Sequence, residues 1–286
     1  MHAFLFSILV FSLASAAAQT SPLGTFDREV TKFLPDDARL VAGGGVGMIS
    51  QPYTGTDAVR LVPEPLVVFQ TEKFSFIGRT LGYEVYQEGP LSVSAIAEWR
   101  FFGHDGGDDS PFLEGMRERK GTAEIGVRAD LDLGRTDVSG TFRADALSRH
   151  GGYEIEGRIS HELSTWPPLS VRPNGGLRFQ SQDLTGYYFG VREDEAVVAG
   201  EPLSTGNGPA LGLDRPAYSP DAAITPFIGL TARQSVTPKI AAVGGFDLNF
   251  FDPTVTDSPI VEERYQVFAF LGVIYVFGDA RATVGH

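Results

Sequence analysis

The segment from Gly121 to Leu163 alternates apolar and polar residues along three successive runs. In the first run, GTAEIGVRADLDLG, every second residue from Ala123 to Leu133 is apolar, and most residues between them are polar or charged. A β-strand points successive side chains to opposite faces, so this pattern predicts an amphipathic strand. The pattern recurs in TDVSGTFRADAL and in YEIEGRISHEL, with short turns between the runs. We therefore expect consecutive strands that each have one apolar and one polar face.

The length of these runs indicates where the apolar face points. Each run is about 11 residues long. Strands of soluble proteins are commonly about 5–6 residues long, whereas a tilted strand needs about 9–11 residues to cross a membrane. In a membrane barrel the apolar residues face lipid and the polar residues face the lumen. A soluble barrel would direct the apolar face inward, and alternation alone fits both. Strand length, strand number and an export signal favour the membrane.

Counting similar runs predicts an all-β fold, a transmembrane antiparallel β-barrel of about 12 strands, within a range of about 10–14. One of them, YYFGV near Tyr188, decides whether the number of strands is even or odd. Without it the number is odd, which conflicts with both chain ends lying in the periplasm. The side on which the 103–119 loop lies therefore stays open. The expected strands are 38–50, 60–70, 73–82, 90–102, 121–133, 136–147, 152–163, 169–181, 185–192, 222–234, 238–250 and 263–277.

The first residues, MHAFLFSILVFSLASAAAQTS, are typical of a cleavable secretory signal peptide. An apolar run leads into small residues, and Ala16-Ala17-Ala18 matches the A-x-A cleavage pattern, although no Lys or Arg precedes the run. The run is shorter than the roughly 20 residues that a spanning helix needs. We expect residues 1–18 to be the signal peptide and residues 19–286 to be one barrel domain in the outer membrane of a Gram-negative cell.

Charge and cysteine content exclude several classes of function. The formal net charge of -13 disfavours nucleic acid as a partner, because a polyanion needs a basic surface. The chain has no cysteine, which excludes disulfides, thiolate catalysis and cysteine-zinc sites.

Three local motifs also fail as chemical sites. The acidic stretch 104–110 lacks the residue order of a calcium loop, and adjacent Ser160 and His161 point to opposite faces of one strand. The glycines of 43–47 are not followed by the Lys-Ser/Thr of a phosphate loop. We expect no catalytic residues, no metal and no cofactor, and therefore no enzyme.

The polar face of the three alternating runs is rich in charge. One interpretation is a cross-linked polar interior that holds the wall rigid. The other is a narrow channel that prefers cations slightly, since acids outnumber bases. The predicted lumen-facing charges are Glu124, Arg128, Asp130, Asp132, Asp137, Arg143, Asp145, Glu154, Glu156, Arg158 and Glu162.

Four segments resemble the MipA/OmpV family of Gram-negative outer-membrane proteins, in an order and spacing that cover most of the mature chain. They are GGGVGMISQPYTGTD (43–57), LEGMRERKGTAEIGV (113–127), LTGYYFGVREDEA (184–196) and DSPIVEERYQVFAFLGVIYVF (257–277). The nine residues after Phe277 depart from the usual ending of the family. The family offers no catalytic residues to transfer to this chain.

The resemblance implies a scaffold that contacts outer-membrane lipid and holds a murein lytic transglycosylase near a penicillin-binding protein. A small channel, or an adhesin acting through loops such as 193–220, is the alternative. A scaffold needs a periplasmic surface, for which residues 26–39, the tail 279–286 and one loop are candidates. That loop, 103–119, is a possible binding site for a partner protein, because interface cores favour Met, aromatics and Arg. The alternative is that it is an ordinary loop with no partner. The residues concerned are Phe112, Leu113, Met116 and Arg117.

Overall fold

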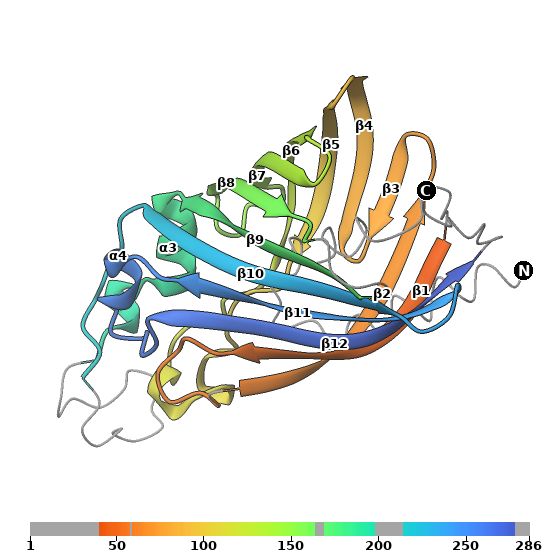
Figure 1. The fold of residues 1–286 in the computed structure, drawn as a ribbon. Coiled ribbons are helices and arrows are strands. Elements are labelled where there is room, and N and C mark those ends of the chain that lie inside the picture. Colours follow the sequence, from red (N-terminus) through yellow and green to blue (C-terminus); the bar gives the residue numbers. More distant parts are fainter. Residues whose placement is uncertain (1–39, 58, 164–168, 198–213, 278–286) are drawn as a thin grey trace, which may run out of the picture.

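The structure, a computed structural model, describes residues 40–57, 59–163, 169–197 and 214–277. These residues form a closed barrel of twelve strands, in the order β1-β12-β11-β10-β9-β8-β7-β6-β5-β4-β3-β2, with every neighbouring pair antiparallel (Figure 1). The predicted fold class and strand number are confirmed. The expected signal peptide, the segment 26–39, the tail 279–286 and most of the proposed adhesin loop lie outside the described residues.

The strands are β1 (Leu40–Ser50), β2 (Val59–Gln70), β3 (Phe74–Ile77), β4 (Thr80–Glu88), β5 (Leu91–Arg100), β6 (Thr122–Asp132), β7 (Thr136–Asp145), β8 (Tyr153–His161), β9 (Leu169–Gln180), β10 (Ala223–Ser235), β11 (Ile240–Phe250) and β12 (Tyr265–Phe277). The described parts of the loops contain the α-helices α3 (Gln182–Phe189) and α4 (Pro253–Thr256) and the short 3-10 helices at Gly106–Asp108, Pro111–Leu113 and Glu193–Glu195. Among the described residues, no helix has the length and apolar character needed to cross a membrane.

The barrel closes where β1 pairs with β12, and glycine makes that contact possible. A Cβ atom on Gly43 would lie 2.0 Å from the carbonyl oxygen of Val273, and one on Gly45 would lie 2.3 Å from that of Leu271. No larger residue fits at either position without moving the backbone of β12. The glycine-rich stretch is therefore a crowded strand, as the lack of phosphate-loop residues predicted.

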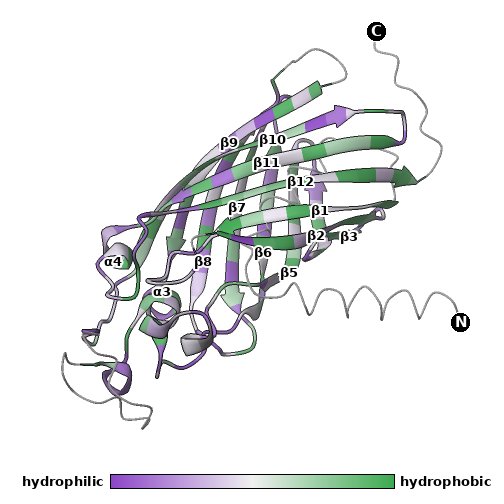
Figure 2. Cartoon of the chain, turned by 90° about the horizontal axis from the view of Figure 1, so that it is seen from below, coloured by the Kyte–Doolittle hydropathy of each residue, from purple (hydrophilic) through white to green (hydrophobic). Residues whose placement is uncertain are grey.

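The exposed face of the barrel is apolar. The buried face is polar and charged along β6 to β9, whereas β1, β2, β11 and β12 bury an apolar cluster. Along β8, Ile155 and Ile159 are exposed, whereas Glu154, Glu156 and Arg158 are buried. Hydrophobic residues recur along the strands in Figure 2. A soluble protein buries its apolar residues, so this arrangement is that of a transmembrane barrel.

Two predicted strands differ from the structure. The range 73–82 is not one strand, because a turn at Gly78, which has φ 55°, divides it into the hairpin of β3 and β4. The range 185–192 is not a strand, because 182–189 form α3, with Leu184 and Tyr188 buried on one face. A short apolar run fits a strand or a buried helix equally well. The number of strands is twelve because the extra hairpin strand replaces the missing one.

The two ends of the barrel differ in their connections. Strand β1 begins, and β12 ends, at the same end, where Leu40 pairs with Phe277; we call this the terminus end. Strands there are joined by short turns, among them 71–73, 89–90, 133–135 and 236–239. The opposite end, the loop end, carries the connections 51–58, 101–121, 146–152, 181–222 and 251–264.

Candidate functional site

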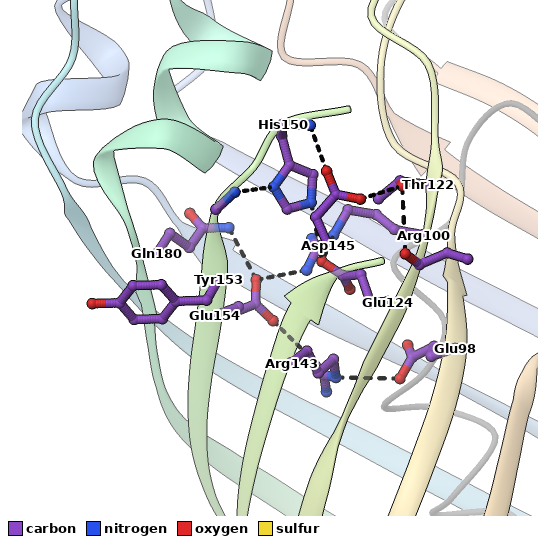
Figure 3. Close-up of polar contacts among 12 residues, drawn as sticks. Glu98, Arg100, Thr122, Glu124, Arg143, Asp145, His150, Tyr153, Glu154 and Gln180 are labelled. Atoms are coloured by element: carbon purple, nitrogen blue, oxygen red, sulfur yellow. Dashed lines mark hydrogen bonds and ion pairs between the residues drawn. The ribbon is translucent and has the colours of Figure 1, made fainter. Parts of the chain in front are cut away.

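The inner face of β5 to β9 carries a network of ion pairs, part of which is drawn in Figure 3. Of the eleven lumen charges expected from the sequence, seven are buried on this face: Glu124, Arg128, Asp137, Arg143, Glu154, Glu156 and Arg158. The others lie nearer the strand ends and are more exposed: Asp130, Asp132, Asp145 and Glu162.

Glu154 is the centre of the network. Its Oε1 lies 2.5 Å from Nη1 of Arg143 and 3.4 Å from Nε of Arg178. Its Oε2 accepts hydrogen bonds from Arg100 at 3.1 Å and from Gln180 at 3.2 Å. The Glu154 side chain is 1% exposed. A buried carboxylate is tolerated only when paired and hydrogen-bonded, and here donors from three other strands meet it.

A second carboxylate extends the network toward β10. Glu156 lies 3.2 Å from Nε of Arg158 and 3.1 Å from Nη2 of Arg178. The guanidinium carbons of these two arginines lie 4.2 Å and 5.0 Å from the centre of the Phe227 ring. Cation–π contact therefore adds to the ion pairs.

Several members of the network were not among the predicted lumen charges. Glu98, Arg100, Arg172 and Arg178 lie on the polar faces of β5 and β9, where continuing the period-two reading would have identified them. Arg172 pairs with Asp137, and its Nη1 lies 3.4 Å from Glu162. With these four residues, the excess of acids over arginines falls from five to three, which weakens the argument for a cation-preferring channel.

The loops pack into an apolar cluster at the loop end, which we call the loop cap. Its buried residues come from four connections, so residues far apart in the sequence meet there: the Tyr53 hydroxyl donates to the Tyr188 carbonyl at 3.3 Å. The buried apolar residues of the loop cap are Tyr53, Leu113, Met116, Leu184, Tyr188, Phe189, Val191, Ala223, Val255, Ile260 and Val261.

Ion pairs and backbone contacts hold the loop cap together. Arg119 donates to both carboxylate oxygens of Glu195, at 3.0 Å and 2.6 Å, and both side chains are 1% exposed. Arg215 donates to the carbonyl oxygens of Phe112, Glu114 and Glu195. A bidentate pair such as that of Arg119 with Glu195 is strong and directional, so it fixes the 101–121 and 181–222 loops against each other.

A small cavity lies between the loop cap and the ionic network. Its volume is about 60 Å³, room for a few water molecules. It is lined by Glu98, Trp99, Arg100, Phe102, Glu124, Arg143, Glu154, Arg178, Gln180, Phe189, Thr225, Asn249, Phe251 and Gln266. His150 joins the two regions, with Nε2 3.3 Å from Glu124 and its ring 5.8 Å from that of Tyr188.

The predicted partner loop is part of the loop cap, and this changes its interpretation. Leu113 is 0% exposed and Met116 is 7% exposed, so neither apolar side chain is presented to a partner. Phe112 is partly buried, and Arg117 is exposed and pairs with Asp194. The sequence did not predict the burial of Leu113 and Met116, because the burial of a loop residue depends on contacts with other loops.

We expect acid to weaken the loop cap. Burial, together with the positive charge of Arg119, lowers the pKa of His104 from 6.5 to about 4, although Asp109 and Glu195 act in the opposite direction. Between pH 6.5 and about 4, His104 therefore binds a proton when the loop cap is open but not when it is closed. The stability of the closed loop cap consequently falls as the pH falls. Burial raises the pKa of Glu195, but hydrogen bonds from Arg119 and backbone N–H groups outweigh it and lower that pKa from 4.5 to about 2. The stabilisation from Glu195 is present above pH 4.5 and is lost toward pH 2.

Limited proteolysis of the 101–121 loop at pH 7 and pH 4.5 measures this effect. Cleavage should be faster at pH 4.5, and the variant His104→Asn should lose most of that pH dependence. An unchanged acid response in the variant, or slower cleavage in acid, would contradict the assignment of His104.

The family model and the similar proteins of known name point to the same family. A family model described as MltA-interacting protein MipA matches residues 42–277. The MltA-interacting protein of Escherichia coli strain K12 is 22% identical over 244 residues, covering 84% of this chain and 91% of that protein. The putative outer membrane protein YiaT of Escherichia coli O157:H7 is 24% identical over 246 residues, covering 84% and 92%. Among solved structures, the CymD monoaromatic hydrocarbon channel covers 92% of this chain and 94% of its own, with 12% identity and a TM-score of 0.41.

Proposed function

This chain is a member of the MipA family of outer-membrane proteins, and we propose that it is a non-enzymatic scaffold that binds a murein lytic transglycosylase at its periplasmic end. Outer-membrane barrels have short periplasmic turns and longer extracellular loops. The terminus end is accordingly periplasmic and the loop end extracellular. The 103–119 loop then lies outside the cell, away from murein.

The observation that carries the proposal is the filled lumen. The loop cap covers the extracellular end, and beneath it the lumen holds the ionic network of β5 to β9 and the buried apolar cluster of β1, β2, β11 and β12. A barrel filled in this way favours a role for its surfaces over passage through it. On the periplasmic side, Val236 is 66% exposed and Leu133 is 57% exposed, each in a short turn that also carries a basic residue, Lys239 or Arg135. Exposed apolar anchors beside charges support protein binding there.

The family supplies the class of partner. The relative named MltA-interacting protein points to a murein transglycosylase. A penicillin-binding protein is proposed as the second partner, held through the transglycosylase, so that wall cleavage and synthesis occur together.

Site-specific crosslinking in intact cells tests the proposal. A photoreactive residue at Val236 should capture a murein hydrolase, and one at Glu118, in the extracellular loop, should not. Because the chain has no cysteine, Glu118→Cys and Val236→Cys can be labelled separately to check orientation, and an impermeant reagent outside the cell should reach only the first. Capture from Glu118, or labelling of Val236→Cys from outside, would contradict the scaffold.

Conductance separates the scaffold from a passive channel. With the loop cap closed and the lumen charges paired, we expect low or no current in planar bilayers at pH 7. The variant Glu195→Ala, which removes the partner of Arg119, should raise the frequency of open events. Large, steady currents from the unaltered protein would instead favour a porin.

A further inference from the structure

The barrel wall has a break beside the extracellular half of β2. Strand β3 pairs with only Val68 to Gln70, and the N–H of Gly78 donates to the carbonyl of Val67 at 2.8 Å. From Val59 to Leu66, β2 pairs with β1 on one side, and none of the described strands pairs with it on the other. The short β3 lies beside β2 in Figure 1.

Two prolines lie on this open edge. Residues two apart along a strand direct their backbone polar groups to the same side, so Pro63 and Pro65 face the break as Val67 does. Neither has an N–H group, which suits an unpaired edge and discourages the addition of another strand. No described strand donates hydrogen bonds to the carbonyls of Leu61, Pro63 and Pro65 on this side. Lipid-exposed backbone of this kind needs hydrogen-bond donors, because hydrocarbon supplies none.

Two arginine side chains, those of Arg79 and Arg60, reach across the break. The guanidinium carbon of Arg79 lies 4.2 Å from the centre of the Phe101 ring, and its Nη2 lies 3.9 Å from Glu64. At the top, Arg60 pairs with Asp109 of the 101–121 loop at 2.8 Å.

A cavity of about 410 Å³ lies at the top of the break. It touches Arg60 at the end of β2 and Trp99 at the end of β5, which are not neighbouring strands. The Trp99 side belongs to the lipid-facing surface and is 38% exposed, at the level where aromatic belts mark the membrane interface. The cavity lining also includes three cations, Arg119, Lys120 and Arg149, and three carboxylates, Asp105, Asp109 and Glu118.

The cations of this cavity differ in how firmly they are held. Arg119 forms a buried ion pair with Glu195 inside the loop cap. Lys120 pairs with Glu118, but both side chains are more than half exposed, so the pair is weak and easily exchanged. Arg149 donates to the carbonyl of Gly121 at 2.6 Å, and no carboxylate among the described residues pairs with it. Lys120 and Arg149 can therefore turn to an incoming anion.

We propose that this cavity binds the headgroup of a phosphorylated glycolipid from the outer leaflet. Its phosphates meet Lys120 and Arg149, its hydroxyl and amide groups donate to the carbonyls along the open edge of β2, and its acyl chains lie beside Trp99 and Leu61. A protein strand is disfavoured by the prolines, and a plain hydrocarbon chain leaves the carbonyls unsatisfied. The proposal does not depend on the scaffold function.

Binding of lipid A to the purified full chain in detergent tests the proposal. With Trp166→Phe, Trp99 is the single tryptophan, and its fluorescence should change as diphosphorylated lipid A is added. The double variant Lys120→Gln/Arg149→Gln should bind at least about tenfold more weakly, the loss expected when two charge-assisted contacts are removed. The matched variant Arg135→Gln/Lys239→Gln, which removes two cations from the periplasmic turns, should bind as the parent does. Heat-modifiable migration on gels confirms that each variant is folded.

Further measurements distinguish a lipid phosphate from free phosphate as the bound anion. Monophosphorylated lipid A should bind more weakly than the diphosphorylated form, and inorganic phosphate should not compete at matched concentration. Equal binding by both double variants would overturn the site. Competition by phosphate would show a site for free anions instead. Loss of binding in EDTA would show that a divalent cation held by Asp105, Asp109 or Glu118 makes the contact, contrary to the proposal.

Discussion

Replacing Glu154 with alanine should lower the free energy of unfolding by about 3–5 kcal/mol, the range for removing one partner of a buried ion pair. Glu154 accepts contacts from Arg100, Arg143 and Arg178. Without it, these buried cations keep their desolvation cost and lose the carboxylate that offsets it. Urea unfolding in lipid vesicles, followed by tryptophan fluorescence, measures the change.

The control for this variant is Glu118→Gln. Glu118 also pairs with a cation, Lys120, at 2.5 Å, but both are largely exposed. Its removal should cost less than about 1 kcal/mol, because exposed pairs are screened by solvent. Equal costs for the two variants would mean that the lumen is hydrated enough to screen charge, and the filled-lumen argument would then fail.

Replacing Val127 with arginine should cost about 2–4 kcal/mol, the range for a cation on the lipid face near the midplane. Val127 is 49% exposed and lies midway along β6, between Ala95 of β5 and Phe142 of β7. The cost arises from placing a charge in hydrocarbon, since the side chain makes no inward contact to lose. Reversible unfolding in vesicles measures it.

A depth control uses the same strand. Leu133, just beyond the periplasmic end of β6, is 57% exposed. Leu133→Arg should cost only about 0–1 kcal/mol, because charge is tolerated near the interface. If both variants cost the same, the bilayer does not cover the middle of β6 as assigned.

For the three runs between Gly121 and Leu163, the sequence predicted which face of the strand meets lipid. In β8 the alternation from Tyr153 to His161 matches the observed exposure throughout. This succeeds because the orientation of a strand side chain is a local property with period two, and lipid requires an apolar residue at each outward position. The same reading, continued through β5 and β9, would have included Arg100 and Arg178.

The pairing of the lumen charges was not predictable in the same way. Glu154 contacts Arg100 of β5, which is 54 residues away in the sequence. Alternation places both residues inside the barrel but does not specify their relative height. Strand register decides that, and register depends on turns and on crowded contacts such as Gly43 against β12.

The loops and the break in the wall were decided by tertiary structure alone. The segment around Tyr188 is helical because Leu184 and Tyr188 pack into the loop cap, a contact that joins connections more than 100 residues apart. Leu113 and Met116 are buried for the same reason. By itself, the sequence determined a membrane barrel with a charged interior, because strand alternation is local. Only the tertiary structure determined that its lumen is capped and that β2 has an open edge, because both depend on which distant segments meet.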